Sequence, residues 1–339
     1  MRKNIGYVVA LLIILFGIYW VYFRNPTESV FGNQEDQFSY TDTASIYSIF
    51  LADRKGNKIH LQRSGSIWMV NEKYQAMAPN VNDILRVIAT QKAMYPVPKI
   101  KHNDIVKGLA GSGIKVELYN KDGDQLRVFY MGGVADDNQG SYMLLEGAQH
   151  VYVVNMLGFN GYLTPYYSTM IEDWRSRIVF DALPHQIKSI TVIDALDSLA
   201  SFKLIQSKDS FVLNPLSKKF VSTTPLIQGK AKSYLDFFKF VNCEGYLNGL
   251  PKLDSIIASV PSKGDIYLEL SDNSVQHVRL YWMFMNKRSK NVYKEKDKDP
   301  LPYDGDRCYA VFNKDADTAI IQLGIFNKIT RKAMEFYHR

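Results

Sequence analysis

The feature that most constrains the fold is a series of strands and helices that the chain carries twice. The stretches "QRSGSIWMVN" from Gln62 and "QSKDSFVLN" from Gln206 each run from a glutamine through a small polar turn into an apolar strand that ends on asparagine. The offset between matched residues grows steadily, from 144 at this pair to 167 at Asn160 and Asn327. A diverged tandem duplication with loop insertions gives such a steady increase, whereas chance similarity between β-rich segments would scatter. We therefore expect two copies of one unit.

The predicted unit is an antiparallel meander joined to helices, so the fold class is α+β. Alternation of apolar and polar residues predicts three strands, then a helix, a short helix and two hairpins, in the same order in both copies. The chain divides into a cytoplasmic stub and transmembrane signal anchor (1–24), a stalk (25–43), a first repeat (44–168), a seam (169–186) and a second repeat (187–337) with an insertion (286–306).

The helices of the first copy carry start and stop signals. Asn80 or Asn82 is the natural cap of a helix over residues 78–94, with Pro96 as its stop. The short helix that follows is predicted to be capped by Asn103 and to end at Gly111. At the junction of the copies the apolar residues are too many for a free linker, so we expect three of them to pack at the seam, namely Trp174, Ile178 and Phe180.

The N-terminus carries an uncharged apolar run from Ile5 to Phe23. At helical rise this run spans about 28 Å, close to one hydrocarbon core. Arg2 and Lys3 precede it and favour a cytoplasmic N-terminus. The competing interpretation, a cleaved signal peptide, requires a shorter apolar region and a small-x-small site, whereas this run ends in bulky residues. We therefore expect a single-pass membrane protein with most of the chain outside the cytoplasm, anchored through Ile5, Leu11, Leu12, Ile13, Ile14, Leu15, Trp20 and Phe23.

The charge balance argues against nucleic-acid binding. The formal net charge of +7 falls to about +4 when Arg2, Lys3 and Arg24, which flank the apolar run, are left out. Nucleic-acid binding calls for a concentrated basic face, which the rest of the chain does not show.

The repeated unit resembles an uncharacterised bacterial envelope family, domain of unknown function 4340. The resemblance covers residues 45–336 and is carried by Ile46, Ile49, Trp68, Tyr142, residues 151–153, the joint "WRSRIVF" and residues 187–192. Phe211 replaces the tryptophan in the second copy. The resemblance implies a single-pass protein of the bacterial inner membrane with the bulk of the chain in the periplasm. Members are often duplicated and often encoded beside export-type or gliding-type ABC transporter components. It implies no catalytic residue, because none is established for the family.

The sequence carries no catalytic signature. It has no G-x-S-x-G elbow, no phosphate-binding glycine loop and no C-x-x-C pair, and its six histidines are spaced singly. We therefore predict no catalytic, cofactor-binding or metal-binding residue. Cys243 and Cys308 either pair in an oxidising compartment or remain free and buried. Four aspartates of the insertion lie among lysines and prolines, which favours solvated charge over a calcium site: Asp297, Asp299, Asp304 and Asp306.

The anchor, the duplication and the long polar insertion favour a non-enzymatic scaffold or accessory subunit of a larger envelope complex for transport, secretion or motility. The residues predicted to contact its protein partner are Lys287, Arg288, Lys290, Lys294, Lys296, Lys298 and Tyr303. A second hypothesis is an envelope glycan-binding or lipid-binding module that uses a groove between the two copies. Tyr166, Tyr167 and Phe237 are candidate aromatic residues for the lining of a glycan cleft. A third is a hydrolase using His60, His150 or His277.

Overall fold

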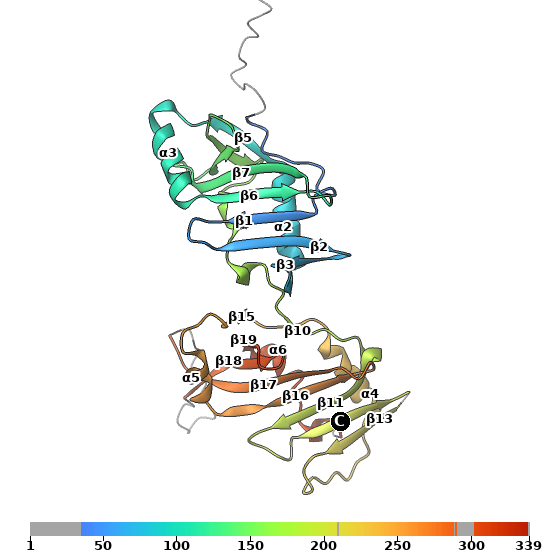
Figure 1. Ribbon diagram of the computed structural model, residues 1–339. Coiled ribbons are helices and arrows are strands. Elements are labelled where there is room, and N and C mark those ends of the chain that lie inside the picture. The colour runs from blue at the N-terminus through green and yellow to red at the C-terminus, as the bar shows by residue number, and fades with distance from the viewer. Residues whose placement is uncertain (1–34, 209, 288, 290–301, 338–339) are drawn as a thin grey trace, which may run out of the picture. The chain divides into compact units, whose positions relative to one another are not determined.

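The computed structural model describes residues 35–208, 210–287, 289 and 302–337 (Figure 1). Within those ranges, no helix is both long enough and apolar enough to cross a bilayer. The predicted anchor, from Ile5 to Phe23, lies outside the described residues, and so do five of the predicted partner-binding residues, namely Arg288, Lys290, Lys294, Lys296 and Lys298.

The chain divides into two compact units between Ser176 and Arg177. Each unit is built around one large sheet in which all the paired strands are antiparallel, and helices pack on the sheets. The predicted α+β class with antiparallel sheets is therefore confirmed.

Unit 1 contains a nine-stranded sheet in the order β4-β3-β2-β1-β6-β7-β8-β9-β5. Its strands are β1 (Ser48–Ala52), β2 (Lys58–Ser64), β3 (Ile67–Val70), β4 (Tyr74–Gln75), β5 (Gln91–Pro96), β6 (Ile114–Tyr119), β7 (Gln125–Val134), β8 (Ser141–Leu145) and β9 (Tyr152–Met156).

Unit 2 contains an eight-stranded sheet in the order β13-β12-β11-β16-β17-β18-β19-β15. Its strands are β11 (Ile187–Asp194), β12 (Phe202–Ser207), β13 (Ser210–Pro215), β15 (Gly245–Tyr246), β16 (Ser262–Leu270), β17 (Val275–Phe284), β18 (Tyr303–Phe312) and β19 (Asp317–Gln322), and a separate pair joins β10 (Ile178–Phe180) to β14 (Val241–Asn242). Position by position, this order repeats that of unit 1 from β3 to β5.

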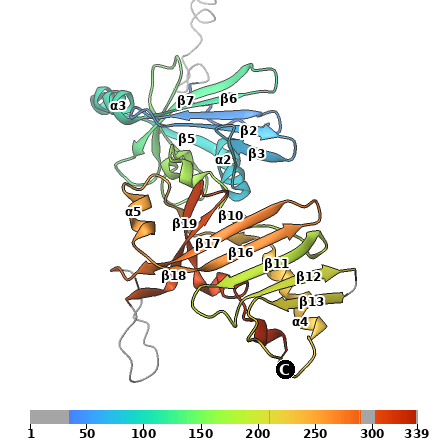
Figure 2. The same cartoon turned by 60° about the horizontal axis from the view of Figure 1, so that its bottom comes forward.

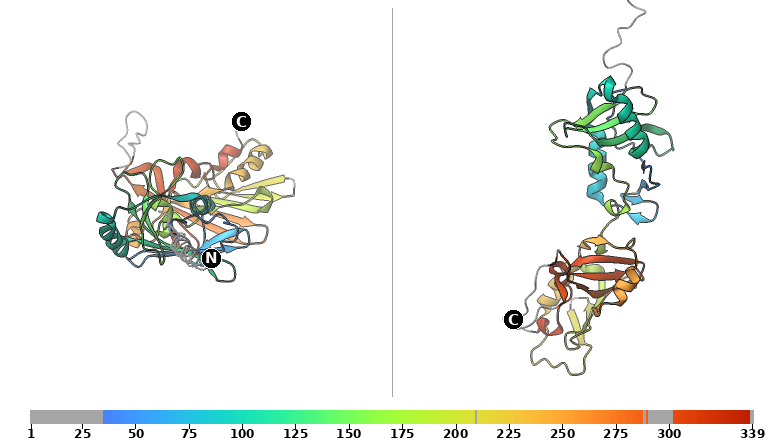
Figure 3. Two further views of the ribbon diagram at one scale, coloured as in Figure 1. Left: turned by 90° about the horizontal axis from the view of Figure 1, so that it is seen from above. Right: turned by 90° about the vertical axis from the view of Figure 1, so that its left-hand side faces the viewer.

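Helices cover both faces of the unit 1 sheet. Helix α2 (Ala78–Thr90) buries Val81, Ile84 and further apolar residues in the main core. Helix α3 (Lys99–Ser112) places Leu109 in a smaller cluster with Val153, whereas the neighbouring Tyr152 and Val154 face the main core. Because adjacent strand residues point to opposite faces, the two helices cover opposite sides. Figure 3 shows α2 and α3 well apart.

The helices of unit 2 pack at opposite ends of its sheet. Helix α4 (Gln228–Leu235) lies beside β13, and α5 (Leu253–Ala258) lies at the other end (Figure 2). The core also takes in α6 (Leu323–Phe326), the 3-10 helix η4 (Asp236–Phe238) and the C-terminal 3-10 helix η5 (Ala333–Phe336).

The first helix of unit 1 differs from its predicted bounds at both ends. Its N-cap is Met77, and Asn80 lies inside the helix and donates to the Asp173 carbonyl at 2.6 Å, so neither predicted asparagine caps it. It ends at Thr90, and the predicted last turn is instead strand β5, paired with β9. Helix α3 likewise begins at Lys99, after the N-cap Pro98, rather than at Asn103.

The predicted stalk is partly wrong, because its end belongs to the core of unit 1. Phe38 is fully buried in the main core, and Tyr40 packs against that core. The Tyr40 N–H donates to the Ile88 carbonyl at 2.8 Å. Two aromatic side chains in an otherwise polar segment therefore fold back onto the unit.

The predicted seam divides between the two units. Trp174 lies in the core of unit 1, whereas Phe180 lies in the core of unit 2, so these two residues do not share one seam. On the unit 1 side, the Ser176 N–H donates to the Gln75 carbonyl at 2.8 Å.

The register of the hairpins β2–β3 and β12–β13 also corrects the residue match drawn from the sequence. Arg63 pairs with Trp68 in unit 1, and Gln206 pairs with Phe211 in unit 2. The residue in unit 2 that corresponds to Arg63 is therefore Gln206, although the sequence had matched Gln206 to Gln62. The correspondence of Trp68 with Phe211 holds, and both residues pack against the core of their unit.

Candidate functional site

A pocket large enough for a small molecule lies in unit 2, between α4 and the C-terminal segment. Its volume is about 630 Å³, and residues of α4, η4 and positions 331–336 line it. Pockets of roughly 300–1,000 Å³ are the size class that holds small-molecule ligands.

Aromatic rings form the floor of this pocket. Tyr234 and Phe336 are almost fully buried, and their ring centroids lie 5.2 Å apart in an edge-to-face arrangement. Phe237, at the side, remains 37% exposed, and Met334 adds a flexible apolar surface. Phe237 is the one aromatic residue of the sequence hypothesis that the structure places in this pocket. Tyr167 is fully buried in unit 1, and Tyr166 packs against the unit 1 core.

Hydrogen bonds hold the two walls together. The Tyr234 hydroxyl donates to the Ile329 carbonyl at 2.5 Å, and the Ile227 N–H donates to the Phe336 carbonyl at 3.0 Å. Complete burial raises the pKa of Tyr234, so its hydroxyl stays protonated and keeps this bond. The pocket therefore has a fixed floor.

The rim of the pocket is basic. Lys230, Arg331 and Lys332 line it together with one acid, Glu335. Arg331 Nη1 lies 2.8 Å from a Glu335 carboxylate oxygen, and the Arg331 guanidinium sits 5.9 Å from the centroid of the Phe237 ring. Three cations against one carboxylate leave a net positive rim beside an apolar floor.

A smaller and more polar cavity of about 270 Å³ adjoins this pocket and shares Arg331, Lys332 and Glu335 with it. Gly264 forms part of its wall with φ 149°. A Cβ at this position would lie 2.1 Å from the Ile193 carbonyl oxygen, so the strand bulge here requires glycine.

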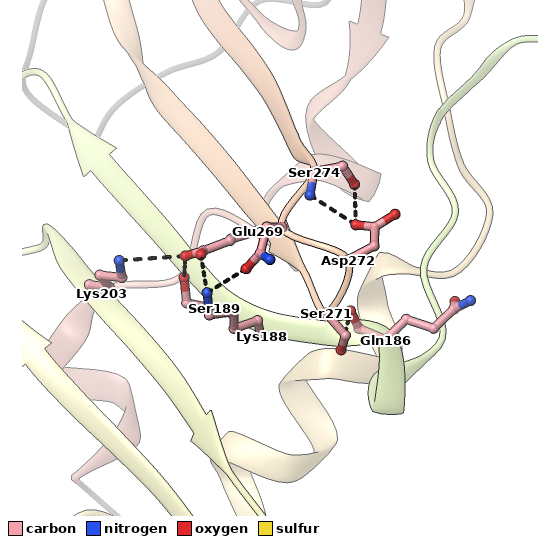
Figure 4. Close-up of polar contacts among 9 residues, drawn as sticks. Gln186, Lys188, Ser189, Lys203, Glu269, Ser271, Asp272 and Ser274 are labelled. Carbon is pink, nitrogen blue, oxygen red and sulfur yellow. Dashed lines mark hydrogen bonds and ion pairs between the residues drawn. The ribbon is translucent and has the colours of Figure 1, made fainter.

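A polar cluster of unit 2 surrounds Glu269 (Figure 4). Lys188 Nζ lies 2.7 Å and Lys203 Nζ 3.7 Å from its carboxylate, and Ser189 Oγ donates to it at 2.8 Å. The hydrogen bonds from Lys188 and Ser189 hold the pKa of Glu269 below its usual range. A carboxylate that stays charged and is paired with two lysines is a poor general base, so we assign this cluster a structural role. Its residues come from β11, β12 and β16, and their contacts hold these strands together.

The histidines of the hydrolase hypothesis lie far apart in the chain, and each faces an acid. His60 lies 3.5 Å from Glu72, His150 lies 2.9 Å from Glu35, and His277 lies 2.7 Å from Asp265. Asp265 also accepts from Arg279 Nε at 2.9 Å, and Tyr267 stacks on the His277 ring with centroids 4.2 Å apart. In the described ranges, no group of three or more His, Cys, Asp or Glu could hold a metal ion.

The structure describes two of the predicted partner-binding residues. Lys287 is exposed, and Tyr303 opens β18, where its ring stacks on Trp282 with centroids 5.3 Å apart. Asp304 is fully buried and its carboxylate accepts two backbone N–H bonds, so solvated charge is the wrong account of this aspartate. Asp297 and Asp299 lie outside the described residues.

Both cysteines are buried in the core of unit 2, and they do not form a disulfide. Burial raises the pKa of the Cys308 thiol to about 12. The sequence had left open whether the two residues pair.

The sequence pattern does not predict the basic rim of this pocket or most of its floor. Arg331, Lys332 and Glu335 fall in a short C-terminal segment with no strong periodicity. Tyr234 bonds to Ile329, just before that segment, across 95 positions of the chain. The only local signal was the mixture of basic and apolar residues in "RKAMEF", Arg331 to Phe336.

No protein-family model matches the chain, no curated protein matches it, and no solved structure matches it. What the pocket can bind therefore follows from its own residues.

Proposed function

We propose that unit 2 is a non-catalytic binding module for an amphiphilic small molecule of the bacterial envelope. One observation carries this proposal: the pocket of about 630 Å³ combines an aromatic floor with a charged rim. The proposal favours the lipid-binding alternative of the sequence analysis and places the site within unit 2.

The physical basis is burial of an apolar chain. Each CH₂ group transferred from water to an apolar surface contributes about 0.8 kcal/mol. The rings of Tyr234, Phe237 and Phe336 supply that surface, and because the floor is held by hydrogen bonds, little ordering is needed on binding.

The test is to block the pocket. Ser233 lines it and is exposed, so Ser233→Trp should fill it. Lys232 is its exposed neighbour on α4 and does not line the pocket, so Lys232→Trp is the matched control. Full-length protein is labelled in membranes with a photoreactive alkyl probe, and the labelled peptides are identified by mass spectrometry. We expect Ser233→Trp to abolish labelling of α4 and the C-terminal segment, and Lys232→Trp to retain it. Equal labelling in all three proteins would refute the proposal.

A second candidate function is the accessory subunit of an envelope complex, as the sequence hypothesis has it. The observation in its favour is an aromatic group at the base of the insertion. Tyr303 lies 5.3 Å from Trp282 and 5.5 Å from Phe284, and Phe284 is 47% exposed. Exposed aromatic residues of this kind are enriched at protein interfaces. The apolar run at the N-terminus, from Ile5 to Phe23, also supports it.

Crosslinking in membranes tests this second function. We expect one dominant crosslinked partner for the full-length protein, and a loss of roughly tenfold in crosslink yield for Phe284→Ser with Tyr303→Ser. Val275→Ser is the control, because Val275 is also exposed but lies at the opposite end of β17. Unchanged yield in the double variant, and on deletion of residues 286–306, would contradict this role.

We also infer that the two units arose by duplication. The support is the shared strand order, together with the growing offset in the sequence. Both units also place a helix after the meander and a second helix before the strand that returns to the centre of the sheet.

A further inference from the structure

We infer that the ligand of this pocket is an anionic single-chain amphiphile, whose tail lies on the aromatic floor and whose headgroup lies at Arg331 and Lys332. The inference rests on the proposed function and adds the chemistry of the ligand. A fatty carboxylate and a lipid phosphate share this chemistry, namely an alkyl chain that ends in an anionic oxygen group.

The charges around the pocket favour an anion. Glu335 is the single acid of the rim, and each of its carboxylate oxygens already has a donor. Arg331 Nη1 lies 2.8 Å from one oxygen, and the Lys332 backbone N–H donates to the other at 2.8 Å. A guanidinium has five N–H donors, and the bond to Glu335 uses one of them. The Lys332 side chain is 61% exposed, and its ion pair with Asp197 is long at 3.6 Å. Both cations can therefore approach a ligand oxygen.

The floor favours an alkyl chain over a glycan. The Tyr234 hydroxyl is engaged by the Ile329 carbonyl, and Phe237, Met334 and Phe336 have no hydrogen-bonding side-chain N–H or O–H. A sugar would place its hydroxyls against this surface without partners, which costs free energy for each group. An alkyl chain has no hydrogen-bonding group that would be left unpaired on the same surface.

The adjoining cavity explains where the headgroup lies. Its own acids are already paired: Asp265 with His277 and Arg279, and Asp194 with the backbone N–H groups of Leu196 and Asp197. The residues common to both cavities are Arg331, Lys332 and Glu335. An anionic group at this junction meets the two cations on one side, while the apolar floor continues on the other.

The experiment compares headgroups on one tail. Full-length protein in membranes is labelled with a photoreactive dodecanoic acid, and dodecanoate, dodecyl phosphate and 1-dodecanol compete. We expect both anions to compete at least about tenfold better than the alcohol, as the loss of a charge-assisted hydrogen bond implies. Whichever of dodecanoate and dodecyl phosphate competes more strongly shows whether the ligand is a fatty carboxylate or a lipid phosphate. Shortening the carboxylate should weaken competition about fourfold for each CH₂ removed.

Charge variants of opposite sign sharpen the result. Arg331→Gln and Lys332→Gln should each weaken anion binding about tenfold and leave the binding of 1-dodecanol unchanged. Glu335→Gln should strengthen anion binding severalfold, because it removes the carboxylate that competes for Arg331. Lys203→Gln is the control, because it removes a positive charge from the Glu269 cluster rather than from the pocket. It should change the binding of neither the anions nor 1-dodecanol.

The two proposals fail in different ways. If 1-dodecanol competes as well as the anions, the headgroup inference is overturned while the binding module stands. If no amphiphile competes and the blocked variant Ser233→Trp labels like the natural protein, the proposed function itself fails, and the inference with it.

Discussion

At the scale of single residues, the most consequential side chain of unit 1 is Gln91. It is fully buried at the start of β5, its amide N–H donates to the Phe38 carbonyl at 2.8 Å, and its amide oxygen accepts from the Tyr167 hydroxyl at 2.6 Å. It therefore ties the N-terminal segment and the 3-10 helix at Tyr167 to one point in the core.

We expect Gln91→Leu to lower the free energy of unfolding by roughly 2–5 kcal/mol, because a buried carbonyl and a buried hydroxyl both lose their partner. Chemical denaturation followed by fluorescence measures this. Tyr167→Phe removes only one of the two bonds and should cost less. An unchanged midpoint for Gln91→Leu would show that water replaces the amide.

The buried Cys308 thiol predicts a dependence of stability on pH. Its folded pKa of about 12 lies above the ordinary value of 9.0 because burial penalises the thiolate. Below pH 9 the thiol is neutral in both states, and this stability is fully present. Between pH 9 and 12 the unfolded chain releases the proton and the folded chain keeps it, so stability falls by up to about 1.4 kcal/mol per pH unit.

Comparison with Cys308→Ala isolates this effect from other titrating groups. We expect the natural protein to lose stability faster than the variant above pH 9, and the two curves to run parallel below it. Parallel curves across the whole range would mean that the thiolate is tolerated in the folded state.

Sequence reasoning fails most clearly at buried polar residues. Gln91 and Asp304 both look like solvent-facing residues in the sequence, yet both are fully buried. The Phe38 carbonyl that pairs with Gln91 is 53 positions away in the chain, and no local pattern records such a bond. Asp304 accepts from N–H groups of its own turn, at Asp306 and Arg307, but the local sequence does not show that this turn is buried.

At the scale of elements, the edge strand β13 is closed by a side chain. Gln228, the first residue of α4, accepts from the Phe211 N–H at 2.7 Å and donates to the Phe211 carbonyl at 3.0 Å. The amide thus takes the place of a neighbouring strand at that residue, and an exposed edge of this kind otherwise promotes pairing between molecules.

We expect Gln228→Ala to cost about 1 kcal/mol and to increase self-association, because both backbone groups of Phe211 are released. Thermal unfolding and light scattering at increasing protein concentration measure the two effects. Lys232→Ala on the same helix is the control and should change neither. Self-association equal to that of the control would show that the edge is protected by other means.

The hairpins could be predicted because their signals are local. The turns between β6 and β7 and between β16 and β17 fall at the predicted charged, glycine-containing or asparagine-containing stretches. The end of α2 could not, because residues 91–94 have acceptable helical composition and become a strand only by pairing with β9, about sixty residues later.

At the scale of the whole molecule, each unit has a core of its own on either side of the boundary at Ser176. Trp174 contributes to the first core and Phe180 to the second, although only five positions lie between them. This contrast allows each core to be weakened separately.

We expect Trp174→Ala and Phe180→Ala each to remove roughly 3–5 kcal/mol from the unit that holds the residue. Hydrogen exchange with mass spectrometry should then show faster exchange first in unit 1 peptides for Trp174→Ala, and first in unit 2 peptides for Phe180→Ala. Equal acceleration of both units in both variants would mean that they unfold together.

The succession of a meander, two helices and two hairpins in each unit could be predicted at this scale. The short strands β4, β5, β14 and β15, and the order of strands within the sheets, could not. The return of β5 and β15 to the far edge, next to β9 and β19, joins residues about sixty to seventy-five positions apart. Such pairing depends on tertiary burial rather than on local pattern.

The two buried cysteines have a practical consequence for spectroscopy. Cys243 and Cys308 are the only cysteines of the chain, and both are enclosed by core side chains of unit 2. The native protein therefore offers labelling reagents no accessible thiol. Pairs of cysteines introduced at exposed positions can carry spin labels or fluorophores in the native background, and the distance between probes on unit 1 and unit 2 then becomes directly measurable.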